Sequence, residues 1–198
     1  MNLYRDKILP YLMNKNIGKK EIIELRRNLL KQVEGNILEI GIGTGINLYL
    51  YPKEINSITA IDLYVRKLPL TNVSVSLFND TAEKMHFPDN SFDTVVSTFT
   101  LCSTKEIDLA LLEIKRVLKS NGKFIFLEHG QSKKDTVRKI QNLFNPIYTC
   151  LAYGCNINRN YRNAIEKAGF NIEKYAIKNA KIYPEILTGI IHEGIAIK

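Results

Sequence analysis

The chain has 198 residues, of which 28 are Lys or Arg and 20 are Asp or Glu, so its formal net charge is +8. This length predicts one domain, and the 45% share of apolar residues excludes a disordered or fibrous chain. The three cysteines include no Cys-x-x-Cys pair, so we expect neither a disulfide framework nor a metal site. No signal-peptide pattern or membrane-length apolar run is seen, so we expect a reduced, cytoplasmic setting.

The positive charge is distributed unevenly along the chain. The net charge is +4 over residues 1–34, −4 over 35–112 and +8 over 113–198. The basic residues are scattered over helical faces, whereas nucleic-acid binders interleave them with aromatic residues along one face. Nucleic acid is therefore not an expected partner. Solvated helix faces are the main interpretation, and attraction of an anionic partner is the alternative.

Helical and strand-like patterns alternate along the chain. Residues 20–33 form an amphipathic pattern with Arg26, Arg27 and Lys31 mostly on the polar side, which predicts a helical cap over 1–34. Apolar runs predict strands at 37–40, 57–61, 73–78, 92–98 and 123–127. Helical spacing predicts a helix before Asn121-Gly122 and another over 160–168, and two further strand-like stretches lie near 171–177 and 188–197.

Strands that alternate with helices predict an α/β fold. We expect one domain over residues 1–198, built on a doubly wound, Rossmann-like sheet flanked by helices. The sheet should have seven strands, mostly parallel. In such sheets, ligands bind at the carboxyl ends of the strands.

The strongest functional signal is the run Leu38-Glu39-Ile40-Gly41-Ile42-Gly43-Thr44-Gly45. Glycines at a strand-to-helix turn allow positive φ angles and let a ligand approach the backbone. The dinucleotide fingerprint would place its third glycine at Ile46, but here it comes early, at Gly45. The next strand ends at Asp62, whose carboxylate can accept both hydroxyls of a ribose. Glu39 or Asp62 alone could be structural, but the two in this order favour an adenosine ligand.

Together with 82–93 and 111–122, these motifs resemble the class I S-adenosylmethionine-dependent methyltransferases over residues 37–170. Many members have an Asp directly before the Ala-Glu pair, where this chain has Thr81, with Asp80 one residue earlier. The adenine contact is therefore left open between Asp80, Thr81 and the Ala82 amide. The resemblance implies S-adenosyl-L-methionine as cofactor, bound by Glu39, Gly41, Gly43, Thr44, Gly45, Asn47, Asp62, Leu63, Asp80, Thr81, Ala82 and Thr98.

Finer likenesses point to the branch that includes alkyl thiol methyltransferases and bacterial phospholipid or quinone methyltransferase-like proteins. They lie at 45–48 with Tyr51-Pro52, and at 100–103, 127–129 and 154–156. The resemblance implies methyl transfer to a small lipophilic acceptor, a thiol first. The alternatives are methyl transfer to a quinone or to a phospholipid headgroup, then methyl transfer to RNA, or cofactor binding without turnover. Animal members carry an apolar N-terminal membrane anchor, which we do not expect here.

Displacement at a sulfonium methyl requires alignment and an available lone pair, so a demanding acid–base pair is not expected. A thiol, with a reference pKa of about 8.5, can lose its proton beside positive charge alone. His129, after the strand 123–127, is the candidate catalytic residue, as a base or an anion-binding group, and a structural histidine is the alternative. Cys102 is expected to be a small buried residue, because Leu101 precedes it where cytosine-C5 methyltransferases have Pro.

Residues 132–159 combine a basic start with an apolar continuation. Pro146 is expected to break the helix here. We expect a lid over an apolar acceptor pocket, with Phe144 and Tyr148 contacting the acceptor and Asn156 and Arg159 near the rim. A surface for anionic lipid, giving peripheral membrane contact, and an ordinary helical hairpin are the alternatives. The sequence does not indicate the oligomeric state.

Overall fold

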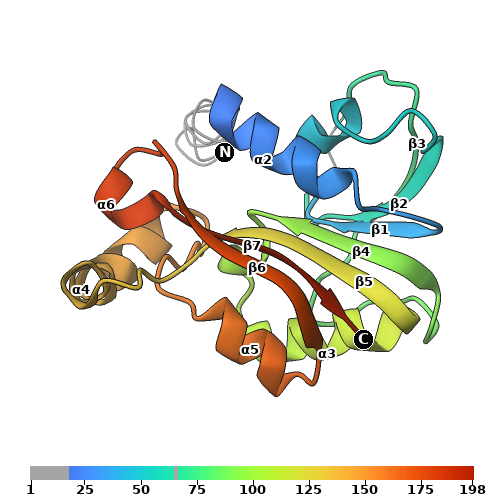
Figure 1. Ribbon diagram of the computed structural model, residues 1–198. Helices are drawn as coiled ribbons and strands as arrows, with labels where there is room; N and C mark the ends of the chain where they lie inside the picture. Colours follow the sequence, from blue (N-terminus) through green and yellow to red (C-terminus); the bar gives the residue numbers. More distant parts are fainter. Residues whose placement is uncertain (1–17, 65–66) are drawn as a thin grey trace.

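One seven-stranded sheet, in the order β3-β2-β1-β4-β5-β7-β6, forms the centre of the computed structural model, which describes residues 18–64 and 67–198 (Figure 1). All neighbouring strands are parallel except β7, which runs antiparallel to β5 and β6. The predicted fold class is therefore confirmed. The strands are β1 (Ile37–Ile40), β2 (Ser57–Ile61), β3 (Ser74–Phe78), β4 (Phe92–Thr98), β5 (Leu118–His129), β6 (Asn171–Asn179) and β7 (Ile190–Ile197).

Helices cover both faces of the sheet. Helix α2 (Lys20–Leu30) lies on one face, while α3 (Ile107–Val117) and α5 (Tyr161–Lys167) lie on the other (Figure 1). Helix α4 (Asp135–Leu151) packs beside the short α6 (Glu185–Thr188) at one end of the sheet. Two 3₁₀ turns, η2 (Ile46–Tyr49) and η3 (Leu101–Ser103), follow β1 and β4.

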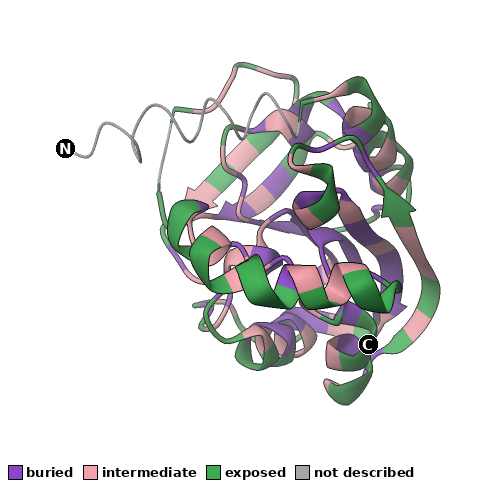
Figure 2. Cartoon of the chain, turned by 90° about the vertical axis from the view of Figure 1, so that its left-hand side faces the viewer, coloured by how far each residue is buried: buried purple, intermediate pink, exposed green. Residues whose placement is uncertain are grey.

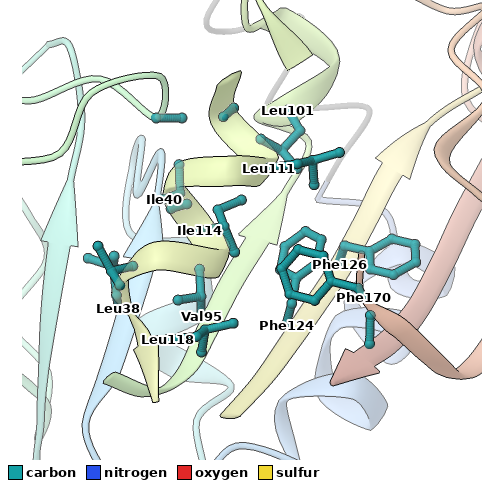
Figure 3. Close-up of a cluster of buried hydrophobic side chains, with 14 of the residues drawn as sticks. Leu38, Ile40, Val95, Leu101, Leu111, Ile114, Leu118, Phe124, Phe126 and Phe170 are labelled. Atoms are coloured by element: carbon teal, nitrogen blue, oxygen red, sulfur yellow. The ribbon is translucent and has the colours of Figure 1, made fainter. Parts of the chain in front are cut away.

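The core has two layers because successive strand residues point to opposite faces of the sheet. On β5, Phe124 and Phe126 join the cluster beneath α3, whereas Ile125 joins the cluster beneath α2. Leu38 and Ile40 of β1 contribute to the α3 side in the same way (Figure 3). Burial on both faces explains why the central strands read as continuous apolar runs rather than as alternating ones.

Most predicted boundaries agree with the structure to within a few residues, but β5 is longer than expected. Helix α3 ends at Val117, and Leu118 already pairs with Phe92 at the start of β4. The Asn121-Gly122 pair therefore lies within β5, beside an irregularity in its pairing with β4, instead of ending the helix. Asn121 has a φ of 63°, a left-handed conformation that asparagine tolerates better than most residues. Thr188, expected in the last strand, lies in α6, where its hydroxyl bonds the carbonyls of Ile182 and Pro184.

The prediction that Pro146 breaks the helix is wrong, because α4 runs through it as a single helix, without a hairpin. Proline removes one backbone donor, which leaves the carbonyl four residues earlier, at Asn142, without its helical partner. Both Pro146 and Asn142 are exposed, so water can bond that carbonyl. Among the described residues, none of the helices is both long and apolar enough to span a bilayer.

Two residues of α3 provide a matched test of this packing. Ile114 is fully buried against the sheet, whereas Leu112 is 53% exposed on the other side of the helix. Ile114→Ala should lower the free energy of unfolding by about 2–5 kcal/mol, because it leaves a cavity in the core. Leu112→Ala should change it by less than about 1 kcal/mol. Urea unfolding followed by circular dichroism measures both, and equal losses would contradict the assigned packing.

Candidate active site

A cavity of about 850 Å³ opens at the carboxyl ends of β1, β2 and β4. The glycine loop and Asp62 form one wall, and residues 80–83 another. Arg26 of α2 and the end of α4 close the remaining sides. The site therefore lies where the strand order reverses in a doubly wound sheet, which is the usual ligand position in such folds.

The glycine loop makes a tight turn directly after β1. Gly41 has a φ of 69°, and a side chain there would collide with Thr100. Gly43 has a φ of 56°, and a side chain there would meet nothing closer than 4.0 Å, because this residue faces the cavity. Glycine at these two positions thus satisfies two needs: close packing against the turn after β4, and an open approach for a ligand.

Asp62 follows β2 and faces the same cavity. Its carboxylate accepts hydrogen bonds from the backbone amides of Gly43 and Tyr64, each at 2.8 Å. These bonds hold the carboxylate beside the glycine loop and leave lone pairs on both oxygens for further donors. The geometry suits a vicinal diol such as that of a ribose.

Glu39 lies on β1 and is buried beneath the loop. One of its oxygens accepts from Asn47 Nδ2 at 2.9 Å and the other from the Tyr51 hydroxyl at 2.7 Å. Burial raises the pKa of this carboxyl to about 7, although these hydrogen bonds and the charge of Arg26 act in the opposite direction. Glu39 lines the cavity and can receive a cationic group, while Asn47 holds it in position.

Arg26 of α2 is a buried cation at the centre of the site. Its Nη1 donates to Asn47 Oδ1 at 2.7 Å and to Thr98 Oγ1 at 2.6 Å, and its guanidinium lies 5.1 Å from the centre of the Phe99 ring. Burial lowers its pKa to about 10, while nearby Glu39 and Glu128 act to raise it. Its Nε is buried without a hydrogen-bond partner among the described residues. Protein atoms enclose this donor, so Arg26 acts on a ligand in the cavity through its charge and through the residues it holds in place.

The expected outward position of Arg26 is therefore wrong. Ile22, Arg26 and Leu30 are the buried residues of α2, and they recur every four residues along one face. A cation at that spacing between two apolar residues was the signal for an inward-facing arginine. Arg27 and Lys31 are exposed, as expected.

Residues 80–82 form the wall opposite the glycine loop. Burial would raise the pKa of Asp80, but hydrogen bonds from the amide and ring of His86 and from the Thr81 amide hold it below its usual value. One Asp80 oxygen takes the two His86 bonds, at 2.8 and 3.0 Å, and the other takes Thr81. Asp80, Thr81 and Ala82 all line the cavity. Each of the three is therefore placed where it can contact an adenine ring.

The buried carboxylate of Glu128 organises the turn after β4. It accepts hydrogen bonds from the Ser97 hydroxyl at 2.7 Å and from the amides of Thr100, Leu101 and Cys102 at 3.1 Å each. This turn places Phe99, Thr100 and Ser103 on the cavity wall. The sequence indicated Glu128 only as part of the motif at 127–129, without a role of its own.

Ten of the predicted cofactor residues line the cavity. Gly45 and Asn47 do not, and neither does the candidate catalytic residue His129. The predicted residues that do line it are Glu39, Gly41, Gly43, Thr44, Asp62, Leu63, Asp80, Thr81, Ala82 and Thr98. Arg26, Phe99 and Lys105 line it without having been predicted, whereas Cys150 and Tyr153 belong to the predicted lid segment 132–159.

His129 is placed behind the cavity rather than at its mouth. Its ring packs against Phe99, with 4.7 Å between the ring centres. Its Nδ1 lies 3.5 Å from the Cys155 sulfur and 3.8 Å from the Cys102 sulfur. Its Nε2 is buried without a partner in the described part of the chain. Phe99 therefore shields His129 from a ligand in the cavity.

The segment 132–159 reaches the cavity only through its later residues, Thr149, Cys150, Tyr153 and Gly154. Phe144 and Tyr148 are not on the wall, which corrects their expected contact with an acceptor. Asn156 and Arg159 are not at the rim either. Their side chains bond backbone carbonyls, Asn156 those of Cys102 and Gly154, and Arg159 those of Leu101 and Thr104.

The site as a whole fits one kind of ligand, a nucleoside that carries a charged amino-acid group. Asp62 offers acceptors for a diol and Glu39 an acceptor for an ammonium group, and the buried Arg26 adds a positive charge that favours a carboxylate. The fold and the site thus define a doubly wound α/β protein that binds a nucleoside derivative.

Comparisons with known proteins identify the class. The family described as "Methyltransferase domain" matches residues 38–126. The human thiol S-methyltransferase TMT1A is 32% identical over 82% of this chain and 70% of its own length. A phosphatidylethanolamine N-methyltransferase from Cereibacter sphaeroides is 28% identical over 54% of this chain and 57% of its own. The quinone C-methyltransferase UbiE of Bradyrhizobium sp. is 31% identical over 57% of this chain and 36% of its own.

Solved structures support the fold. The [4+2]-cyclase SpnF superimposes with a TM-score of 0.65, at 18% identity over 89% of this chain and 80% of that chain. Because a cyclase shares the architecture, the fold alone does not define the reaction. The sequence relationships do define the family: the chain belongs to the class I S-adenosylmethionine-dependent methyltransferases.

The raised pKa of Glu39 predicts how stability depends on pH. Folding shifts this pKa from about 4.5 to about 7, so the folded state holds the proton more tightly. The resulting stabilisation is complete below the unfolded pKa and is lost as the pH rises through 7. Relative to Glu39→Gln, the free energy of unfolding should fall by up to about 1.4 kcal/mol per pH unit between pH 4.5 and 7. Urea unfolding of both proteins across this range measures the difference, and parallel curves would contradict it.

Proposed function

We propose that this protein transfers the methyl group of S-adenosyl-L-methionine to a small lipophilic thiol. The observation that carries the proposal is the similarity to a thiol S-methyltransferase along most of the chain, combined with a cation, Lys105, on the cavity wall. A quinone or a phospholipid headgroup is the second candidate acceptor, because relatives that act on these also match.

The residues on the wall fit this cofactor. We assign Asp62 to the ribose hydroxyls and Glu39 to the ammonium group, and the positive charge of the buried Arg26 favours the carboxylate. Thr81, the Ala82 amide and Asp80 are the candidates for adenine. When bound, the cofactor supplies a methyl group already activated by a sulfonium sulfur. The glycine loop lets it approach the backbone, and the strand ends fix its orientation.

The acceptor needs only to be aligned and to lose its proton. Lys105 lines the cavity, and its positive charge favours a thiolate. The thiolate sulfur forms a bond to the methyl carbon while the bond from that carbon to the sulfonium sulfur breaks. The products are a methyl thioether and S-adenosylhomocysteine, and the thiol proton goes to solvent. No role for His129 as a base is included, because Phe99 separates it from the cavity.

A transfer assay with a labelled methyl donor tests this function. The acceptor panel should contain alkyl thiols, quinols, phosphatidylethanolamine vesicles and RNA, and we expect labelled thioether and S-adenosylhomocysteine in equal amounts. Asp62→Asn should weaken cofactor binding about tenfold or more, because it removes a charged acceptor.

Asp108→Asn is the matched control. Asp108 lies on α3, where it pairs with Lys167 and does not line the cavity, so cofactor binding should be unchanged. Calorimetry measures the binding of all three proteins. Methylation of RNA alone, or cofactor binding without any product, would refute the proposal.

Helix α4 suggests where a lipophilic acceptor comes from. It crosses the front of the molecule in Figure 2 with an outer face that is largely exposed, including Leu143, Phe144 and Ile147 at 72%, 44% and 59%. Lys133, Lys134 and Lys139 lie at the basic start of the same segment. We propose that this face rests on an anionic membrane surface, which such a combination of apolar and basic residues favours. The end of α4 would then bring the acceptor to Tyr153 at the cavity.

Two sets of variants separate the cavity end of α4 from its outer face. Tyr153 lies on the wall, with its ring 6.5 Å from that of Tyr64, so Tyr153→Ala should raise the KM for a water-soluble thiol several-fold. The double variant Phe144→Ala, Ile147→Ser should weaken binding to vesicles with anionic lipid but leave that KM unchanged. Enzyme kinetics and vesicle co-sedimentation give the two readouts, and the reverse pattern would show that the faces are assigned wrongly.

A further inference from the structure

A buried cluster that the proposed transfer does not use lies next to Phe99 and Ser103 of the cavity wall. It consists of Cys102, His129 and Cys155, which are 1%, 6% and 3% exposed. Their Sγ, Nδ1 and Sγ atoms all lie within 4.8 Å of one another. None of the three residues lines the cavity, so the cluster requires an explanation of its own.

The two distances from His129 Nδ1 match those between ligands around one zinc ion, and the two sulfurs lie within 4.8 Å of each other. Zinc bonds thiolate sulfur at about 2.3 Å and imidazole nitrogen at about 2.0–2.1 Å, and tetrahedral angles then place the ligand atoms roughly 3.5–3.8 Å apart. The observed distances from His129 Nδ1 are 3.5 Å to Cys155 and 3.8 Å to Cys102. Two thiolates and an imidazole are also the donor set that zinc prefers.

The three donors converge because the fold fixes each segment. The Cys102 amide donates to the buried Glu128 carboxylate, which places the turn after β4. The backbone carbonyl of Cys102 accepts hydrogen bonds from the amide and from the side chain of Asn156, the residue next to Cys155. Tyr153 and Gly154 precede Cys155 with φ angles of 51° and 81°, a tight left-handed turn that directs the chain back towards β5.

The expectation that the cysteines form no metal-binding group rested on sequence spacing. Spacing cannot reveal this cluster, because each of its side chains comes from a different segment: the turn after β4, the end of β5 and the loop after α4. Short-range motifs such as Cys-x-x-Cys cannot reveal a site of this kind.

We propose that Cys102, His129 and Cys155 bind a single Zn²⁺ ion through two thiolates and the Nδ1 of a neutral imidazole. Binding releases the two thiol protons to solvent, and the fourth position takes a small exogenous ligand such as water. The proposal goes beyond methyl transfer and does not depend on it. Phe99 packs on His129, and Ser103 Oγ lies 3.8 Å from the Cys102 sulfur. Because Phe99 and Ser103 line the cavity, the ion would also hold this part of the cavity wall in place.

Metal analysis of the whole chain tests this site. Protein purified under reducing conditions and reconstituted with Zn²⁺ should hold about one equivalent after gel filtration. Co²⁺ in its place should give the thiolate-to-metal absorption bands and the visible bands of tetrahedral coordination. Cys102→Ser and Cys155→Ser should each bind Zn²⁺ at least tenfold more weakly.

Cys150→Ser is the matched control, because Cys150 is exposed and lies outside the cluster. It should retain the full equivalent and the Co²⁺ spectrum. Should a cluster variant fail to fold, release of Zn²⁺ from the folded wild-type protein by a mercurial gives the same information. A wild-type protein with less than a tenth of an equivalent, or a Cys150 variant that loses as much metal as the cluster variants, would refute the site. Neither result bears on the transfer assay.

Discussion

A buried guanidinium holds the two halves of this site together. Arg26 comes from a helix that precedes the sheet, yet its Nη1 is bonded to Asn47 after β1 and to Thr98 at the end of β4. Desolvating a cation is costly, and removal of one partner from a buried charged network is more destabilising than the network's net contribution. Glu39 and Glu128 supply the compensating charge from β1 and β5. The position of α2, the glycine loop and the turn after β4 are therefore coupled through one side chain.

This coupling explains why several polar residues are buried in a region that could have been apolar. Asn47 bonds Arg26 through its oxygen and Glu39 through its nitrogen, so its amide orientation is fixed by both. Glu128 fixes three successive amides of the neighbouring turn. Such satisfied networks hold groups rigidly, which is what a reaction that depends on alignment requires.

The sequence predicted the sheet well because its signals were local. The central strands are continuous apolar runs in the sequence. The glycine loop at 41–45 and Asp62 at the end of the next strand predicted one wall of the cavity. Predictions failed where long-range packing decides. Pro146 stays helical because its side of α4 is exposed to water, and Arg26 turns inward because the acidic strand ends lie beneath it. His129 follows its strand as expected, but Phe99 has a φ of 55° and its ring covers the histidine. No sequence pattern available here indicated that conformation.

The two walls of the cavity differ in how they are built. Strand ends and their turns supply the wall that we assign to the methyl donor, whereas the loop that follows α4 adds Tyr153 and Gly154 on the side that we assign to the acceptor. Substitutions in that loop can reshape one wall while the glycine turn stays intact. The methyl acceptor can therefore change during evolution while the binding of the methyl donor stays the same. This agrees with the names of the relatives, which are methyltransferases of thiols, of a phospholipid and of quinone biosynthesis.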